Sequence, residues 1–406
     1  MRKVYLRGRS QGGDFHSIHR EMIKNPPDGY QILTGAPTYQ KQQQSTPNLG
    51  KTQQLLYRFD RKLDRSALAD NLWQEAKTLS YMLVKRTQNL NTLIDSKADL
   101  VYSSQQLMFA KRSWVVDFEY ANALVDYGDI RLLRRFVQKS LASRYCKKIL
   151  PWSDWAKRTL YRSLDCDSFR GKIETVHFGA PPRSFVKKKD DDRLRLLFVG
   201  STNLFNYLNF EWKGGFEVVD AFLELNKKYD NIELTMRTWV PPEIQEKCAH
   251  IPNIKTLSSP LSEEALANLY SSSDIFLFPS YLNLGMAILE AMSYELPVIA
   301  VNLYDIPEAV RNMKTGILLD PPPDTPFYTW NGAPNHHDKS LLFKIRQSRR
   351  WMVNQIVDKA SLLIENGSLR KRFGREARLL LEQGEFSVKR RNDKLKKVFD
   401  EAVCAG

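Results

Sequence analysis

Short runs rich in aliphatic and aromatic residues recur along this chain, and longer mixed segments separate them. The runs occupy residues 3–6, 31–34, 98–103, 113–118, 147–150, 173–178, 194–200, 232–237, 254–257, 275–278 and 298–301. Each is too short for a stable helix and is typical of a strand buried in a parallel sheet. Segments between them, such as 215–229 and 262–271, are predicted as helices, and Ser262 is a favourable N-cap for the second. The alternation indicates an α/β protein built on parallel sheets.

A glycine-rich turn follows the first predicted strand and precedes a helix that starts near Phe15. Residues 8–12 formally fit the G-x-S-x-G nucleophile elbow of α/β-hydrolases, but no upstream strand supplies the loop that an oxyanion hole needs. A turn that closes the first strand of a nucleotide-binding half is the better interpretation. His16 and His19 lie one helical turn apart and could ligate a metal, but without a third ligand nearby ordinary helix positions are favoured.

The length of 406 residues suits two domains of roughly 150–200 residues each. We expect an N-terminal domain over 1–182, a second domain over 183–385 and a final helix over 386–406. Proline and runs of charge mark residues 179–192 as the linker. Residues 321–350, rich in Pro and Asn, are predicted to form a surface excursion from the second domain.

The formal net charge of +15 requires an anionic partner, such as a phosphate ligand, nucleic acid or an acidic membrane surface. No apolar run approaches the roughly 20 residues of a membrane span, and the N-terminus does not resemble a signal peptide. The cysteines are scattered and form no Cys-x-x-Cys pair. We therefore expect a reduced, cytoplasmic protein without structural zinc.

A basic run extends over residues 131–162 and is interrupted by Trp152 and Trp155. Its first part, 131–145, places five apolar residues on one stripe: Leu132, Leu133, Phe136, Val137 and Leu141. One interpretation is a helix that packs on the sheet with a solvated basic face. The other is a surface that docks on anionic lipid, with the protein at the cytoplasmic face of a membrane. RNA binding is disfavoured because the run contains no recognised RNA-binding signature.

The most informative stretch is 275–301. It predicts a strand, a glycine just before the N-terminus of a helix, the helix itself over 286–292, and a second strand. Free N–H groups and the helix dipole at Gly285, Met286 and Ala287 form a site for an anion such as phosphate. Glu290 lies about one turn further, where a carboxylate can accept hydrogen bonds from a ribose diol. The alternative is a plain βαβ unit in which Glu290 is solvated.

The sequence of this stretch resembles the nucleotide-sugar signature of retaining glycosyltransferases with the GT-B fold, especially glycosyltransferase family 4 (group 1). The matching residues are Pro279-Ser280, Gly285, Glu290-Ala291-Met292 and Pro297-Val298-Ile299-Ala300. Two positions depart from the family pattern: Leu282 replaces the first Glu, and Glu295 replaces the glycine before the proline. The resemblance is strongest over residues 193–320.

The resemblance implies two Rossmann-like domains that face each other across a cleft, with a C-terminal helix that returns to the first domain. It also implies transfer of a sugar from a nucleotide-diphosphate sugar with retention of configuration, without metal or another cofactor. In the family, Lys-Gly at a helix start holds the diphosphate, and Lys213-Gly214 matches that pair. The family's second phosphate cation corresponds to Ser201, so one charge is missing.

In the family a residue near Glu119 often contacts the sugar, and the glycine-rich turn allows backbone to approach the donor phosphates. Arg237 and Asn283 are candidates to hold the sugar that Leu282 cannot bind. The resemblance therefore assigns Lys213 and Glu119 as catalytic candidates, no metal ligand, and a donor site that comprises Gly12, Gly13, Ser201, Lys213, Arg237, Asn283, Gly285, Met286, Ala287 and Glu290.

The expected partners are a nucleotide-sugar donor, a glycan or lipid-linked acceptor and an anionic membrane surface, with nucleic acid disfavoured. The alternative function is a catalytically impaired GT-B scaffold that binds nucleotide sugars or acts as a regulatory protein at a membrane. Leu282 and Ser201 are consistent with that alternative because each removes a contact that the family uses.

Overall fold

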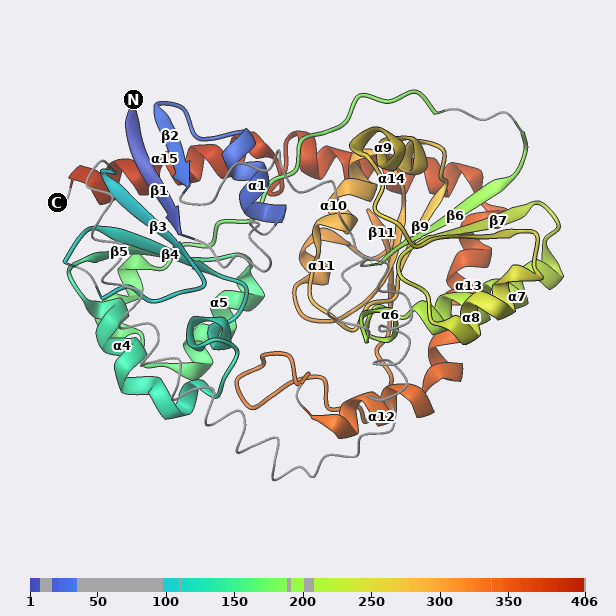
Figure 1. Ribbon diagram of the computed structural model, residues 1–406, viewed down its shortest axis with the longest axis horizontal. Coiled ribbons are helices and arrows are strands. Elements are labelled where there is room, and N and C mark those ends of the chain that lie inside the picture. The colour runs from blue at the N-terminus through green and yellow to red at the C-terminus, as the bar shows by residue number, and fades with distance from the viewer. Residues whose placement is uncertain are drawn as a thin grey trace.

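The computed structural model of the protein describes residues 1–7, 17–34, 98–109, 111–187, 191–200, 208–336 and 338–404. Two parallel sheets lie side by side, one in each half of the molecule (Figure 1). The first sheet has the order β2-β1-β3-β4-β5 and consists of β1 (Arg2–Arg7), β2 (Tyr30–Thr34), β3 (Leu100–Ser104), β4 (Trp114–Phe118) and β5 (Cys146–Pro151).

The second sheet has the order β11-β10-β9-β6-β7-β8. Its strands are β6 (Leu194–Val199), β7 (Ile232–Arg237), β8 (Ile254–Leu257), β9 (Ile275–Phe278), β10 (Val298–Val301) and β11 (Gly316–Leu319). The order of strands reverses between β6 and β9, and ligands of such sheets bind outside the carboxyl ends of the strands at this point. The fold therefore places a binding site where the loops after β6 and β9 leave the sheet.

Helices cover both faces of each sheet, which is why the central strands are buried along their whole length. All residues of β3, β4, β9 and β10 are buried. The helices of the first half are α1 (Ser17–Lys24), α4 (Arg134–Ala142) and α5 (Asp154–Ser163). Those of the second half are α6 (Asn209–Trp212), α7 (Gly215–Lys228), α8 (Pro242–Ala249), α9 (Glu263–Ser271), α10 (Met286–Ser293), α11 (Ile306–Ala309), α12 (Lys339–Gln347), α13 (Arg349–Glu365) and α14 (Gly367–Glu382). No helix in these parts of the chain is both long and apolar enough to cross a membrane.

Local capping fixes several helix starts. The Ser262 side chain accepts a hydrogen bond from the amide of Ala265, as the predicted N-cap requires. The Ser153 side chain accepts one from the amide of Ala156 at the start of α5. These bonds satisfy amide groups that the first helical turn leaves without a partner.

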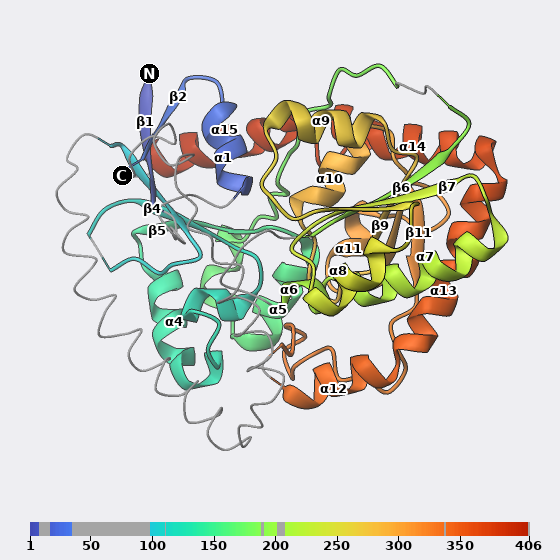
Figure 2. The ribbon, with the colours of Figure 1, turned by 45° about the vertical axis from the view of Figure 1, so that its right-hand side comes forward.

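The last helix, α15 (Val388–Cys404), crosses back from the second half and packs on the first sheet (Figures 1 and 2). Its buried residues Leu395, Val398 and Phe399 share a core cluster with Val4 and Leu100 of the first sheet. Polar contacts reinforce this packing, since the hydroxyl of Tyr30 donates to Asp400 at 2.7 Å and Lys394 donates to the backbone oxygen of Thr175 at 2.8 Å. The predicted return of the C-terminal helix to the first half is confirmed.

Three local predictions were wrong. Residues 173–178 are not a strand. The amides of Glu174 and Val176 donate to backbone oxygens of β5, but only Ile173 forms a β-bridge with that strand. Residues 131–145 are not one helix, because a 3₁₀ turn over Ile130–Leu133 precedes α4 and leaves Leu132 half exposed.

The segment 321–350 is not a surface excursion. Phe327, Asn331 and Ala333 are buried, and the side-chain amide of Asn331 donates to Ser163 of the first half at 2.7 Å. The segment therefore forms part of the contact between the two halves.

Candidate functional site

The turn at Lys213-Gly214 packs directly on the loop that follows β9. Gly214 has φ of 75°, and a Cβ atom there would lie 2.3 Å from the backbone oxygen of Pro279. The amide of Tyr281 also donates to the backbone oxygen of Trp212 at 2.8 Å. Glycine is required at position 214 because only glycine combines this conformation with so close an approach. The contact fixes Lys213 at the carboxyl edge of the second sheet.

Lys213 and Arg237 are two neighbouring cations at this edge. Burial, followed by the nearby Arg237 cation, lowers the pKa of Lys213 to about 8. No residue in the described ranges forms a hydrogen bond or ion pair with the Lys213 ammonium, and Arg237 Nε is buried without a hydrogen-bond partner there. Two neighbouring cations without an ion-pair partner among the described residues create a site that favours an anion.

The N-terminus of α10 opens toward the same edge. Gly285 is the N-cap and has no side chain, and among the described residues a Cβ atom placed on it would contact only Phe278 Cζ, at 3.9 Å. Among the described residues, no acceptor binds the amides of Gly285, Met286 or Ala287. These amides therefore remain available to an anion in the space before the helix.

Glu290 lies one turn into α10 and accepts a hydrogen bond from the hydroxyl of Tyr270 at 3.1 Å. Burial raises the pKa of Glu290, and this effect is opposed first by the Tyr270 hydrogen bond and then by the cations of Arg183 and Arg237. Tyr270 itself is buried and stacks on Tyr294, with ring centroids 5.5 Å apart. Glu290 is thus held rigidly on the side of α10 that faces Arg237.

Glu119 and Asn283 meet across the junction of the two halves. Asn283 Nδ2 donates to Glu119 Oε2 at 3.2 Å, and the Tyr127 hydroxyl also hydrogen-bonds to Glu119. The Tyr127 hydroxyl lies 2.6 Å from Gln105 Oε1, and both residues have a left-handed backbone, with φ of 64° and 55°. Strained backbone of this kind persists where surrounding structure enforces it, often at functional sites. Sequence reasoning found Glu119 and Asn283 but missed Tyr127 and Gln105, which have no signal in local spacing.

Asp305 is a further residue that sequence reasoning missed. It is buried and accepts a hydrogen bond from the amide of Leu284 at 2.7 Å, one residue before the α10 cap. Burial raises the pKa of Asp305 to about 7. Leu282, in contrast, packs partly buried against the apolar core.

The structure brings together Lys213, Arg237, Gly285 and Glu290. The other donor candidates Gly12, Gly13 and Ser201, and also His16, lie outside the described residues. His19 is described and binds Asp117, at 2.8 Å. Within the described ranges, no group of three or more His, Cys, Asp or Glu side chains is arranged to hold a metal ion.

Comparison with known protein families finds a match for part of the second half. Residues 186–327 match the family described as Glycosyl transferases group 1. This range contains Lys213, Arg237, Gly285 and Glu290, whereas Glu119 lies outside it. A D-inositol 3-phosphate glycosyltransferase of Rhodococcus jostii is 38% identical over 66 residues, which are 16% of this chain and 15% of that protein. The chain thus matches less than a sixth of this relative's length.

Solved structures extend the similarity to the whole chain. A glycosyltransferase of Rickettsia africae has a TM-score of 0.58 at 14% identity, and the match covers 99% of this chain and 98% of the other. The HepE protein of Anabaena, in complex with UDP and glucose, has a TM-score of 0.56 at 12% identity, with coverage of 98% and 99%. Together with the two parallel sheets, these similarities show that the chain has the predicted GT-B fold.

Proposed function

We propose that the protein is a glycosyltransferase that moves a sugar from a nucleotide-diphosphate sugar to a glycan or lipid-linked acceptor with retention of configuration, as in family 4. The observation that carries this proposal is the convergence of Lys213 and Arg237, neither of which forms an ion pair among the described residues, on the open N-terminus of α10. The match of residues 186–327 to group 1 glycosyltransferases supports it.

The chemical role of this edge is to stabilise a leaving diphosphate. Negative charge grows on the diphosphate as its bond to the sugar breaks, and preorganised cations and N–H groups lower the free energy of that state. Lys213 and Arg237 supply the cations, and the amides of Gly285, Met286 and Ala287 supply the N–H groups. We propose that this charge makes the reaction metal-independent and that no other cofactor takes part.

The Glu290 carboxylate, fixed by Tyr270, would accept hydrogen bonds from the ribose diol of the same ligand. The Anabaena structure was solved with UDP and glucose, and we extend that class of ligand, a nucleoside diphosphate and a hexose, to the edge formed by Lys213, Arg237 and the start of α10. Glu119 and Asn283 lie at the junction of the halves, where an acceptor would meet the donor sugar.

A second candidate function is nucleotide-sugar binding without turnover. Leu282 favours it, because this side chain packs against the core and offers no acceptor to a sugar hydroxyl. The two functions differ in product formation but share the diphosphate site. A transfer and hydrolysis assay over UDP-, GDP- and ADP-sugars therefore separates them.

Thermal unfolding and calorimetry with UDP, GDP and ADP test the shared site. We expect at least one of these nucleotides to raise the midpoint of unfolding, since a ligand that binds only the folded state stabilises it. If none of the three binds at millimolar concentration, the diphosphate site and both functions are rejected. If one binds but its sugar nucleotide is neither transferred nor hydrolysed with any acceptor class, the binding function is favoured.

A further inference from the structure

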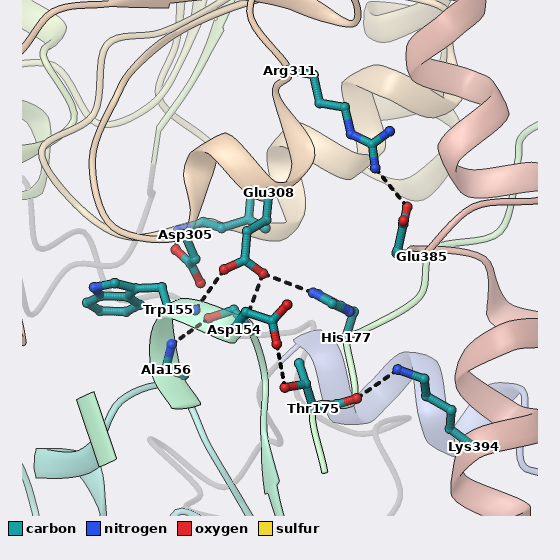
Figure 3. A network of polar contacts seen from close by, with 12 residues as sticks. Asp154, Trp155, Ala156, Thr175, His177, Asp305, Glu308, Arg311, Glu385 and Lys394 are labelled. Atoms are coloured by element: carbon teal, nitrogen blue, oxygen red, sulfur yellow. Dashed lines mark hydrogen bonds and ion pairs between the residues drawn. The ribbon is translucent and has the colours of Figure 1, made fainter. Parts of the chain in front are cut away.

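Helix α5 of the first half is capped by a carboxylate from the second half. The amides of Asp154 and Trp155 donate to Glu308 Oε2 and Oε1 at 3.0 and 2.7 Å (Figure 3). His177, in the segment that leads to the linker, lies 2.9 Å from the same carboxylate. A negative group at a helix N-terminus satisfies free amides and interacts favourably with the helix dipole. Glu308 thus joins the two halves at a defined helix end.

Other contacts hold the same junction. The indole Nε1 of Trp155 donates to the backbone oxygen of Gly332 at 3.1 Å. Asn331 donates to Ser163, at the end of α5, and to Asn122 Oδ1 at 2.8 Å. Both ends of α5 therefore contact the second half.

Glu308 is also close in sequence to Asp305, which holds the proposed donor loop, the segment Leu282–Leu284 before the α10 cap. Asp305 immediately precedes α11 and accepts the amide of Leu284, the residue before the α10 cap. The two α11 residues Ile306 and Ala309 are fully buried, so this short helix is fixed within the core. One rigid segment therefore contacts α5 through Glu308 and the loop before Gly285 through Asp305.

We propose that Glu308 is a positioning residue that transmits the seating of α5 to the proposed donor loop. When α5 is capped, α11 is held in place, Asp305 retains the Leu284 amide, and the amides at the start of α10 face the anion site. When the cap is lost, this loop is less ordered and binds a diphosphate more weakly. The effect on ligand binding rests on the proposed function, whereas the effect on loop order does not.

A matched pair of substitutions at Asp154 isolates the cap. Proline at the first position of a helix is well tolerated and lacks the N–H that donates to Glu308. The preceding residue, Ser153, has φ of −150° and ψ of 164°, an extended conformation compatible with a following proline. Asp154→Pro therefore removes one of the two amides that donate to Glu308, and Asp154→Ala is its control. Both variants lose the side-chain bond from Thr175, but only the alanine variant keeps the amide.

Hydrogen exchange of the Leu284 amide is the primary measurement. We expect the Leu284 amide to exchange about fivefold faster in Asp154→Pro than in Asp154→Ala. This factor is the change in the local opening equilibrium that the loss of one hydrogen bond typically causes. The affinity for UDP, GDP or ADP, whichever binds, should fall by a similar factor in Asp154→Pro alone. Equal exchange of Leu284 in the two folded variants would overturn the proposal.

Glu308→Gln provides a second variant if Asp154→Pro does not fold, which circular dichroism will show. It keeps the shape of Glu308 and one acceptor but loses the charge. We therefore expect the Leu284 amide to exchange faster than in wild type and more slowly than in Glu308→Ala. Wild-type exchange in both Glu308 variants would also reject the proposal. If exchange responds as expected but wild type binds no nucleotide, the positioning role stands and the proposed function fails.

Discussion

The hydroxyl of Tyr270 donates to Glu290 across 20 residues of sequence and fixes the carboxylate one turn inside α10. Tyr270 belongs to α9 and is buried, so its hydroxyl cannot follow the carboxylate if Glu290 moves. Only Oε2 of Glu290 makes this bond, and within the described residues Oε1 has no hydrogen-bond partner. The pair thus leaves one oxygen of a fixed carboxylate available as an acceptor for the proposed donor.

Replacing Glu290 with alanine should abolish nucleotide binding and sugar transfer together. The ribose diol would lose its acceptor, and a buried hydroxyl left without a partner costs about 1–3 kcal/mol. Calorimetry with the nucleotide that stabilises wild type is the measurement, and Tyr270→Phe is the control that keeps the carboxylate but loosens it. Unchanged affinity in a folded Glu290→Ala protein would remove Glu290 from the donor site.

Lys213→Ala should weaken nucleoside diphosphate binding by about 1–3 kcal/mol, the range of a charge-assisted hydrogen bond. The matched control is Lys227→Ala, which removes an exposed lysine from the opposite end of α7. Calorimetry of both variants gives the difference. If the two lose the same small amount, net charge explains the effect and Lys213 does not contact the ligand.

The pKa of Lys213, lowered to about 8 by burial and by Arg237, predicts that diphosphate affinity falls as pH rises through about 8. Above that pH the free protein has lost the proton, so binding must take one up. The ordinary pKa of 10.5 applies in the unfolded chain, which therefore binds more protons between about pH 8 and 10.5. The free energy of unfolding without ligand should rise with pH over that interval.

Calorimetry in two buffers of different ionisation enthalpy, together with urea unfolding at each pH, checks both parts. Lys213→Ala should bind weakly at every pH and show no proton uptake near pH 8. Proton uptake that persists in this variant would assign the titration to another group.

Leu282→Glu should change which sugar nucleotide is used more than it changes the affinity for the nucleotide itself. Leu282 offers no acceptor to a sugar hydroxyl, whereas a carboxylate would restore one. Relative transfer rates with UDP-, GDP- and ADP-sugars measure the change, and Leu282→Met is the apolar control because Leu282 packs against the core. A large loss of nucleotide affinity in the Glu variant alone would contradict the prediction.

Attachment to anionic membranes remains a prediction for the basic run, in a revised form. Trp152 and Trp155 are buried and cannot reach a membrane. The exposed face instead consists of Leu132 and basic residues of the same stretch, and Arg131 stacks on the half-exposed Trp330. Each basic residue near an anionic surface contributes about 1 kcal/mol.

Sedimentation with anionic liposomes at low and high salt tests this surface. We expect binding at low salt that weakens with salt, and a clear loss in the double variant Arg134→Glu/Arg135→Glu. Lys227→Glu is the charge control on another face. If the protein stays in the supernatant at low salt, the membrane hypothesis is rejected. If it binds RNA instead, the basic surface is a nucleic-acid-binding surface.

The central strands β9 and β10 of the second sheet were predictable because they are buried on both faces and therefore consist of apolar residues, and β7 was predictable because buried residues alternate along it. The bounds expected for β7, β8, β9 and β10 coincide with those observed. The start of α10 was also predictable, since a glycine before a run of helix formers is a local signal. These features depend on neighbours in sequence, which a single sequence displays.

The contacts between the halves were not predictable, because they join positions that are distant in sequence. Glu308 and Asp154 are 154 residues apart, and Asn283 and Glu119 are 164 apart. The error at 321–350 has the same origin. Its prolines and asparagines indicate a loop but cannot indicate that Asn331 is buried against Ser163.

The crossing of α15 determines the order in which this protein can mature. Synthesis makes the first sheet early, but α15, which covers Val4, Leu100 and Val115, is made only after the second sheet. Until α15 has been made, that apolar face lacks this part of its cover and is open to misassociation or to chaperones. The packing of the N-terminal half is therefore complete only after the second half has been made.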